Sequence, residues 1–243
     1  ILVQLAQMAS VAVENALLYR DLRDADHRKD HFLATLAHEL RNPLSPLTAA
    51  AQLLSMEPGN AAQVVELTVV MSRQLDQLRR LIDDLLDVSR ISSGKLMLRR
   101  QPVLLADVVA AAVDAAKPSL QAAGHRFDLH ATQERLVVFG DPVRLGQIVG
   151  NLLVNAVKYT PSGGSISLDL DVVGRQARIR VQDDGIGIAP EMLDKIFGLF
   201  TQVDSSNTHA QGGLGIGLTL AKTLVEMHGG EIEAASSGPA RGS

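Results

Sequence analysis

A histidine followed directly by a glutamate opens the segment His38 to Leu44, which reads His-Glu-Leu-Arg-Asn-Pro-Leu. An imidazole nitrogen with a free lone pair is a nucleophile, and a carboxylate orients the ring by accepting a hydrogen bond from the other nitrogen. Pro43 has no N–H for the carbonyl of Glu39, so a helix here should bend within one turn of His38. A solvated surface histidine is the ordinary alternative. The segment predicts a nucleophile beside a hinge if the rest of the chain supplies an electrophile.

Two amides and an ammonium are spaced to lie on one face of a second helix. Asn151, Asn155 and Lys158 follow one another at i, i+4 and i+7. Carboxamide oxygens suit magnesium, and an ammonium suits phosphate. The wet side of an amphipathic helix has the same composition. This segment alone therefore leaves both interpretations open.

Two glycine-containing segments follow. Asp183 stands at a strand end and begins the run Asp-Asp-Gly-Ile-Gly-Ile; an aspartate can accept the amino proton of adenine, and glycines let the backbone approach a flat base. The run from Gly212 to Leu218 opens a helix, where free N–H groups and the positive helix end favour phosphate. An Asp-Gly turn and a flexible loop are the alternatives. The order of all three segments together indicates a nucleotide site.

The elements that must position these residues divide the chain in two. From Gln4 to Leu36, and again from Val64 to Val88, apolar residues recur at alternating steps of three and four, with a break from Glu57 to Asn60. This pattern predicts an antiparallel helical hairpin. Each helix carries more apolar surface than one partner covers, so two hairpins should form a dimeric four-helix bundle.

After Ser92-Ser93-Gly94 the pattern changes to short alternating strands, glycine turns and a few helices. Strands are expected at 95–100, 126–130, 136–139, 165–173, 177–183 and 231–235. Helices are expected at 105–123, after the Asp141-Pro142 cap, after Ala189-Pro190 and at 214–228. The predicted fold is multidomain, an all-α hairpin followed by an α/β sandwich.

These motifs together closely resemble the sensor histidine kinases of two-component signalling, whose ATP-binding domain has the Bergerat fold, and the resemblance covers nearly the whole chain. It matches His38 to Leu44 with the phosphoacceptor box, Asn151 to Thr160 with the N box, and Asp183 to Ile188 with the first glycine box. The F box and the second glycine box match 197–200 and 213–217, and 197–212 would be a mobile lid. The resemblance implies a signalling helix at 1–25, a dimerisation and phosphotransfer domain at 26–93 and a catalytic domain at 94–243.

The resemblance also implies roles for single residues. His38 would be the phosphoacceptor, Glu39 its acid/base partner, and Asn42 the residue that positions water for phosphatase activity. The cofactors would be ATP and Mg²⁺, with Asn155 as the magnesium ligand. Contacts with the nucleotide are implied for Asn151, Asn155, Lys158, Tyr159, Asp183, Gly185, Gly187, Gly213, Gly215 and Gly217.

The implied partners are a second copy of the chain and the receiver domain of a response regulator, whose aspartate would take the phosphoryl group. The first twenty residues resemble the closing helix of a GAF-type sensor, and Ile1 opens mid-pattern, so an upstream sensor domain is expected. Whether His38 is served by ATP of its own chain or of its partner depends on the turn at 57–61, which the sequence leaves open.

The composition gives no support for a nucleic-acid-binding or membrane-spanning protein. Among 243 residues the net charge is −4, which gives no field for nucleic acid or anionic lipid. No apolar run reaches the roughly 18 to 20 residues of a membrane helix, and no cysteine is present, which fits a reducing cytoplasm. The composition favours a cytoplasmic location, and the resemblance implies a protein-histidine kinase.

Two rival functions stay open. An ATPase of the same fold resembles this chain, but those proteins carry a water-activating glutamate where Asn151 stands, and an amide is a poor general base. The other rival is a dimeric signalling module that binds nucleotide without turnover.

Overall fold

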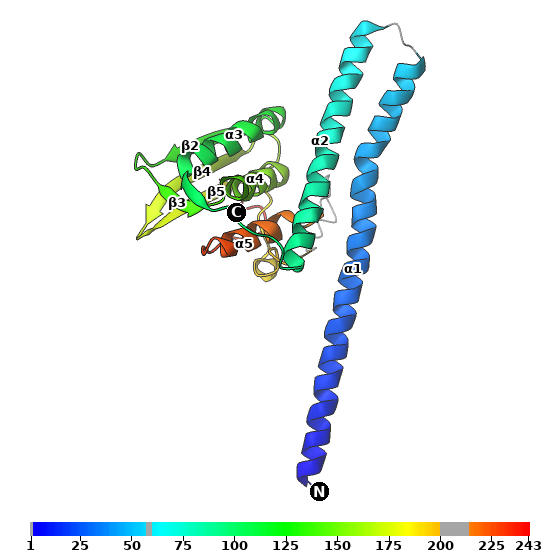
Figure 1. Cartoon of the computed structure of the whole chain (residues 1–243), viewed down its shortest axis with the longest axis vertical. Coiled ribbons are helices and arrows are strands. Elements are labelled where there is room, and N and C mark those ends of the chain that lie inside the picture. The colour runs from blue at the N-terminus through cyan, green and yellow to red at the C-terminus, as the bar shows by residue number, and fades with distance from the viewer. Residues whose placement is uncertain (1, 57–59, 200–213) are drawn as a thin grey trace. The chain divides into compact units, whose positions relative to one another are not determined.

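The computed structural model describes residues 2–56, 60–199 and 214–243, and it forms two compact units, residues 1–81 and 82–243. Figure 1 shows the chain coloured from the N-terminus to the C-terminus. The boundary between the units falls inside a helix, α2, so this helix contributes residues to both.

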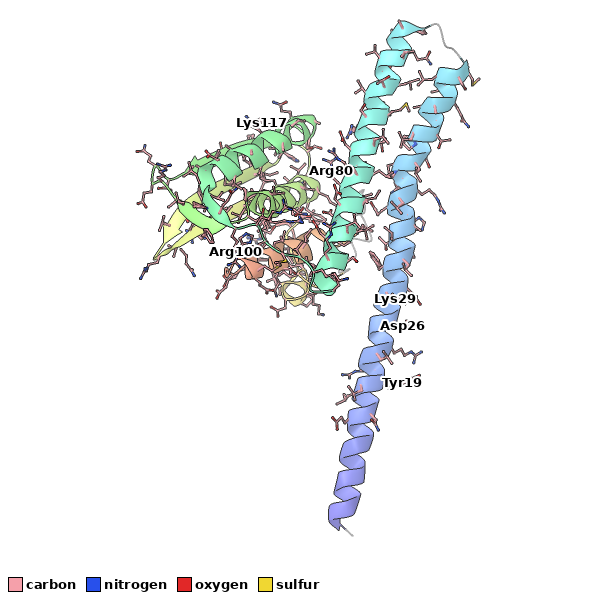
Figure 2. The ribbon with its side chains drawn as sticks, viewed as in Figure 1. Tyr19, Asp26, Lys29, Arg80, Arg100 and Lys117 are labelled. Carbon is pink, nitrogen blue, oxygen red and sulfur yellow. The ribbon has the colours of Figure 1, made fainter. Side chains whose placement is uncertain are left out.

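The helical region consists of α1 (Leu2–Met56) and α2 (Ala61–Ser92), which confirms the two long helices expected from the heptad pattern. The expected turn at 57–59 lies outside the described residues. The sequence pattern is also right about the end of α2, since Ser92 is its last residue. Figure 2 labels Tyr19, Asp26 and Lys29 on the first half of α1, and all three are exposed.

Two prolines, Pro43 and Pro46, lie inside α1, and the helix continues through both. Neither can donate to the carbonyl four residues earlier. Nearby, the hydroxyls of Ser45 and Thr48 donate to carbonyls one turn back, at 3.2 and 2.9 Å. Such side-chain bonds favour helix bending. The bend beside His38 stays a prediction.

The second unit contains the end of α2 and an α/β domain with two sheets. Its elements are β1 (Gln101–Leu104), α3 (Leu105–Ala122), β2 (Arg126–Ala131), β3 (Val137–Gly140), α4 (Pro142–Tyr159), β4 (Ser165–Val173), β5 (Gln176–Asp183), a short 3₁₀ turn (Pro190–Met192) and α5 (Gly217–Met227). Strand β1 pairs antiparallel with β3, while β2 pairs parallel with β4, and β4 pairs antiparallel with β5. This mixed arrangement confirms the predicted α/β layer.

Two strand predictions are wrong. Residues 95–100 form no strand, because the residues that pair with β3 come later, from Gln101 opposite Gly140 to Leu104 opposite Val137. Residues 231–235 alternate in polarity but are assigned no strand, and among the described residues their backbone has no ladder partner. The helix expected after Ala189-Pro190 is only the 3₁₀ turn.

The core lies between the sheet and the helices α3 and α4. Strand β4 alternates from Ser165 to Asp171, and its side chains Ile166, Leu168 and Leu170 are buried. The main cluster is formed by Val103, Leu105, Val108, Val109, Ala112, Val113, Val149, Leu153, Leu168 and Leu170. Helix α4 packs against the sheet through this cluster, so the opposite face of α4 has a defined position relative to the sheet.

Candidate functional site

The predicted phosphoacceptor segment lies on α1, in the first unit. The side chain of His38 is exposed, whereas the adjacent Glu39 is buried, with 7% of its surface accessible. Asn42, one turn further along, is also exposed. The segment therefore presents an imidazole and an amide to solvent from neighbouring turns. The remaining predicted site residues belong to the second unit.

Helix α4 positions the predicted N box. Asp141 caps its start by accepting hydrogen bonds from the backbone N–H groups of Val143 and Arg144 at 3.1 and 3.3 Å, and Pro142 is the first helical residue. Burial alone raises the pKa of Asp141, but amide hydrogen bonds from Arg99, Arg144 and Val143 and the charge of Arg144 outweigh it, so the pKa is lowered. The cap predicted from sequence is confirmed.

The end of α5 is tied to the start of α4 through His228. Its Nε2 accepts a hydrogen bond from the backbone N–H of Asp141 at 3.0 Å, and its Nδ1 lies 2.7 Å from the carbonyl of Leu224. This pattern fits a neutral ring that carries its proton on Nδ1. The end of α5 is thus bonded to the start of α4.

The start of α5 is bonded to the middle of α4 through Asn151. Its Nδ2 donates to the backbone carbonyl of Gly217, the first residue of α5, at 3.0 Å. Leu214 and Ile216 are buried and anchor the glycine-rich approach, while Gly215 adopts a φ of 65°, which favours glycine. The predicted contact residue Gly213 lies outside the described residues.

The start of α5 has no side-chain cap. The N-cap position, Ile216, provides no hydrogen-bonding side chain, so the first amides of this 11-residue helix have no side-chain acceptor. In the same turn, the buried hydroxyl oxygen of Thr219 has no hydrogen-bond partner. Uncapped amides at a helix start suit an anionic oxygen.

The other polar residues of α4 lie near its end. Lys158 donates from Nζ to the hydroxyl of Tyr159 at 3.1 Å and lies 4.7 Å from the centroid of its ring. Asn155 is half-buried, and its carboxamide makes no hydrogen bond to the described parts of the chain. An unused carboxamide oxygen fits a hard cation such as magnesium, and the ammonium fits phosphate. The residues present therefore fit a magnesium nucleotide.

The predicted adenine-reading residue, Asp183, is the last residue of β5. Its Oδ1 accepts from the backbone N–H of Gly185 at 2.9 Å, and its Oδ2 accepts from the hydroxyl of Ser243 at 2.6 Å. A Cβ on Gly185 would collide with the carbonyl of Tyr159, so glycine is required there for close packing. A Cβ on Gly187 would collide with the backbone of Gly238.

Sequence reasoning missed the serines that hold this loop. Ser243 exchanges backbone hydrogen bonds with Asp183, and the hydroxyl of Ser236 accepts from the N–H of Ile188 at 3.0 Å. Both serines stand in a run of small residues that signals only a loop. Both serines are distant in sequence from the residues that they contact, so no local pattern indicated these hydrogen bonds.

A further contact missed from sequence joins the predicted F box to α5. The Nζ of Lys222 lies 5.7 Å from the centroid of Phe197, within cation–π range. Residues 200–212 of the expected lid lie outside the described residues. The ammonium of Lys222 thus lies over the ring of the first residue of the predicted F box.

Among residues 2–56, 60–199 and 214–243, no group of three or more His, Cys, Asp or Glu side chains could hold a metal ion. No helix in these ranges is long and apolar enough to cross a membrane.

Two family models match the chain. The His Kinase A (phospho-acceptor) domain matches residues 28–94, and the histidine kinase-, DNA gyrase B- and HSP90-like ATPase matches residues 140–243. The first match includes His38, and the second includes the polar face of α4 and the start of α5. The matches therefore divide the predicted site residues between two families.

Known proteins of the same kind are similar to most of the chain. The autoinducer 2 sensor kinase/phosphatase LuxQ of Vibrio vulnificus is 34% identical over 92% of this chain and 27% of its own length. The signal transduction histidine-protein kinase BaeS of Escherichia coli is 31% identical over 95% of this chain and 47% of its own length. The chain thus spans about a quarter to a half of these relatives.

Solved structures agree on the fold. The Acinetobacter baumannii histidine kinase AdeS is 25% identical, with a TM-score of 0.59, over 83% of this chain and 92% of that chain. ShkA, solved in full length with AMPPNP, is 29% identical, with a TM-score of 0.63, over 86% of this chain and 43% of that chain. With both domains matched in order, this chain belongs to the sensor histidine kinases and comprises their phosphoacceptor and ATP-binding regions.

Proposed function

We propose that this chain is the catalytic core of a protein-histidine kinase, in which ATP held by the second unit phosphorylates His38 of the first. The observation that carries the proposal is the bond from Asn151 to Gly217, which sets the amide face of α4 against the uncapped start of α5. Uncapped amides and the polar face of α4 together suit a bound triphosphate. His38 is exposed, as the acceptor of a group from another domain must be.

The reaction we propose is an in-line displacement. A nitrogen of the His38 imidazole forms a bond to the γ-phosphorus while the bond from that phosphorus to the β,γ-bridging oxygen breaks, and ADP leaves with the electron pair. Glu39 accepts the proton of the other ring nitrogen. Lys158 and the α5 amides stabilise negative charge on the phosphoryl oxygens.

We propose magnesium as the companion of ATP and Asn155 as the residue that holds it. When bound, magnesium would supply positive charge at the phosphates. Contacts with the nucleotide are proposed for the residues named above, including Gly213. Asp183 would accept the adenine amino proton, and Tyr159 would pack near the base.

The rival ATPase function is disfavoured by one residue. Asn151 offers an amide that donates to Gly217 and cannot deprotonate water, so bound ATP is protected from hydrolysis until His38 reaches it. A module that binds nucleotide without turnover would have no need for an exposed histidine in the phosphoacceptor segment.

We propose a homodimer built on α1 and α2. Leu33, Leu44 and Leu53 of α1 and Val65 and Leu75 of α2 are exposed in the single chain, which supports a second apolar partner. Sedimentation of the chain as a monomer at micromolar concentration would contradict this proposal.

The phosphoryl group would pass from His38 to an aspartate of a response-regulator receiver domain, the N–P bond breaking as an O–P bond forms. We also propose that the same chain removes that phosphate through Asn42. In the whole protein, a GAF-like sensor would precede the signalling helix, and the location would be the cytoplasm, where ATP and receiver proteins are found.

One experiment separates the three functions. The chain is incubated with magnesium and γ-labelled ATP, and label on the protein and free phosphate are measured in the same sample. A kinase gives acid-labile label on the protein with little free phosphate. Continuous release of free phosphate without bound label would show an ATPase, and binding with neither product would show a non-catalytic module.

A further inference from the structure

The last turns of α2 contain a buried acidic side chain, Asp87, whose surface is only 5% exposed. Its Oδ2 accepts a hydrogen bond from Nη1 of Arg144 and another from Nε2 of Gln147, the second at 3.0 Å. Arg144 also donates to Oε1 of Gln147 at 2.8 Å. The three side chains, one from α2 and two from α4, close a triangle.

This contact differs from the other ion pairs of the described residues. In each of those, at least one side chain is more than a third exposed. The side chains of Arg144 and Asp87 are only 18% and 7% exposed. A pair shielded from water and salt depends strongly on geometry, and loss of one partner leaves an uncompensated charge.

The segment that follows α2 is held at the same place. The backbone N–H of Arg99 donates to Oδ2 of Asp141 at 2.9 Å. The guanidinium of Arg100, labelled in Figure 2, donates to the carbonyl of Met227 at the end of α5. The end of α2 and its continuation therefore contact both helices that form the nucleotide site.

This arrangement explains why the boundary between the compact units falls inside α2. Residues 82–92 are part of the second unit, while the same continuous helix begins at Ala61 in the first. Helix α4 carries Asn151, Asn155 and Lys158 beyond its first turns. Asp87 is therefore a direct polar link between the end of α2 and the helix that carries these three residues.

We propose that Asp87 is a positioning residue for phosphoryl transfer: its contacts with Arg144 and Gln147 couple α2, the helix of the phosphoacceptor hairpin, to the nucleotide helix α4. Asp87 does not contact the reacting atoms. It fixes α4 relative to the end of α2, so that the γ-phosphate is presented to His38 in a productive orientation. This inference rests on the proposed kinase function.

The test compares Asp87→Asn with Asp83→Asn, which changes an exposed acid one turn earlier on the same helix. ATP affinity is measured with a fluorescent ATP analogue, and the rate of label transfer to His38 is measured separately. We expect Asp87→Asn to slow transfer about tenfold while ATP affinity changes less than about twofold. Asp83→Asn should match the wild type in both.

Two further variants keep the proposal testable if Asp87→Asn folds poorly. Gln147→Ala removes one hydrogen bond and leaves the ion pair, so it should slow transfer by a smaller factor. The exchanged pair, Asp87→Arg with Arg144→Asp, should recover part of the rate lost in Asp87→Ala. A merely stabilising contact predicts parallel losses of ATP affinity, transfer rate and thermal stability, and that result would overturn the proposal.

A readout independent of kinase activity separates this inference from the proposed function. Hydrogen exchange of residues 82–92 is followed with and without the non-hydrolysable analogue AMPPNP. Coupling predicts that the analogue protects these amides in the wild type and in Asp83→Asn but not in Asp87→Asn. Equal protection in all three proteins would overturn the coupling, whereas absence of label on His38 alone would overturn only the kinase function.

Discussion

The carboxamide of Asn151 donates to the backbone carbonyl of Gly217 at 3.0 Å, so the middle of α4 is bonded directly to the first residue of α5. One side chain therefore fixes the separation between the polar face of α4 and the uncapped amides of α5. In the proposed function, that separation must match the length of a triphosphate.

Replacing Asn151 with alanine should weaken ATP binding. The change removes the bond that joins α4 to α5 and, in the proposed function, an amide contact with the phosphates, a loss of about 1–3 kcal/mol, or about 5- to 150-fold in affinity. Calorimetric titration with ATP measures the effect. Gln121→Ala, at an exposed position of α3, serves as the control, and equal affinity in the two variants would contradict the assignment.

Asp183→Asn should remove preference for adenine. The carboxylate accepts hydrogen bonds from Gly185 and Ser243 and, in the proposed function, from the adenine amino group. An amide in its place presents one donor group where an acceptor is needed. Competition between ATP and GTP for the site measures the change, and an undiminished preference for ATP would count against Asp183 as the adenine-reading residue.

The Asp141 cap predicts a specific pH dependence. Because the pKa of Asp141 in the folded chain lies below its ordinary value of 3.8, its charge contributes stability above that value, and the contribution is lost as pH falls toward the folded pKa. Asp141→Asn keeps a capping oxygen but loses the charge. At neutral pH, the free energy of unfolding measured with urea should be about 1 kcal/mol lower for Asp141→Asn than for the wild type. This difference should narrow below about pH 4.

Asp128→Asn, at an exposed position of β2, is the matched control and should leave stability unchanged over the same pH range. A deficit in Asp141→Asn that stays constant down to about pH 2 would mean that the charge makes no contribution.

Asn42→Ala should separate the two proposed activities. Asn42 is exposed one turn beyond His38, and in the proposed function its amide orients water and does not receive the phosphoryl group. The variant should still acquire label from ATP but should lose dephosphorylation of a phosphorylated receiver domain. Ser45→Ala, in the next turn, should retain both, and a phosphatase rate unchanged in Asn42→Ala would exclude the role.

Much of this fold was predicted from local sequence patterns, because helix starts and strand faces depend mainly on neighbouring residues. The cap and first-turn proline at Asp141-Pro142 set the start of α4, and alternation from Ser165 to Asp171 set β4 with its buried face. The N box residues fall on one helix for the same reason. Motif order, rather than any single motif, indicated a nucleotide site.

The rest depends on contacts between distant segments. Asp87 lies outside the seam formed by Leu85 and Val88, and only its packing against α4 makes it a buried ion-pair partner. The hydroxyl of Ser243 reaches Asp183 from sixty residues away. The start of β1 was misplaced because its register is set by Val137 to Gly140 and not by its own alternation.

The central claim is that His38 receives the γ-phosphate. The most direct measurement is labelling of the wild type and His38→Gln with γ-labelled ATP. The stability of the bound label in acid and in alkali is then measured, and the labelled peptide is identified by fragmentation. His31→Gln, on the same helix, is the control. We expect acid-labile, alkali-stable label on the peptide that contains His38 in the wild type and in His31→Gln, and none in His38→Gln. Acid-stable label, or label that persists in His38→Gln, would contradict the account.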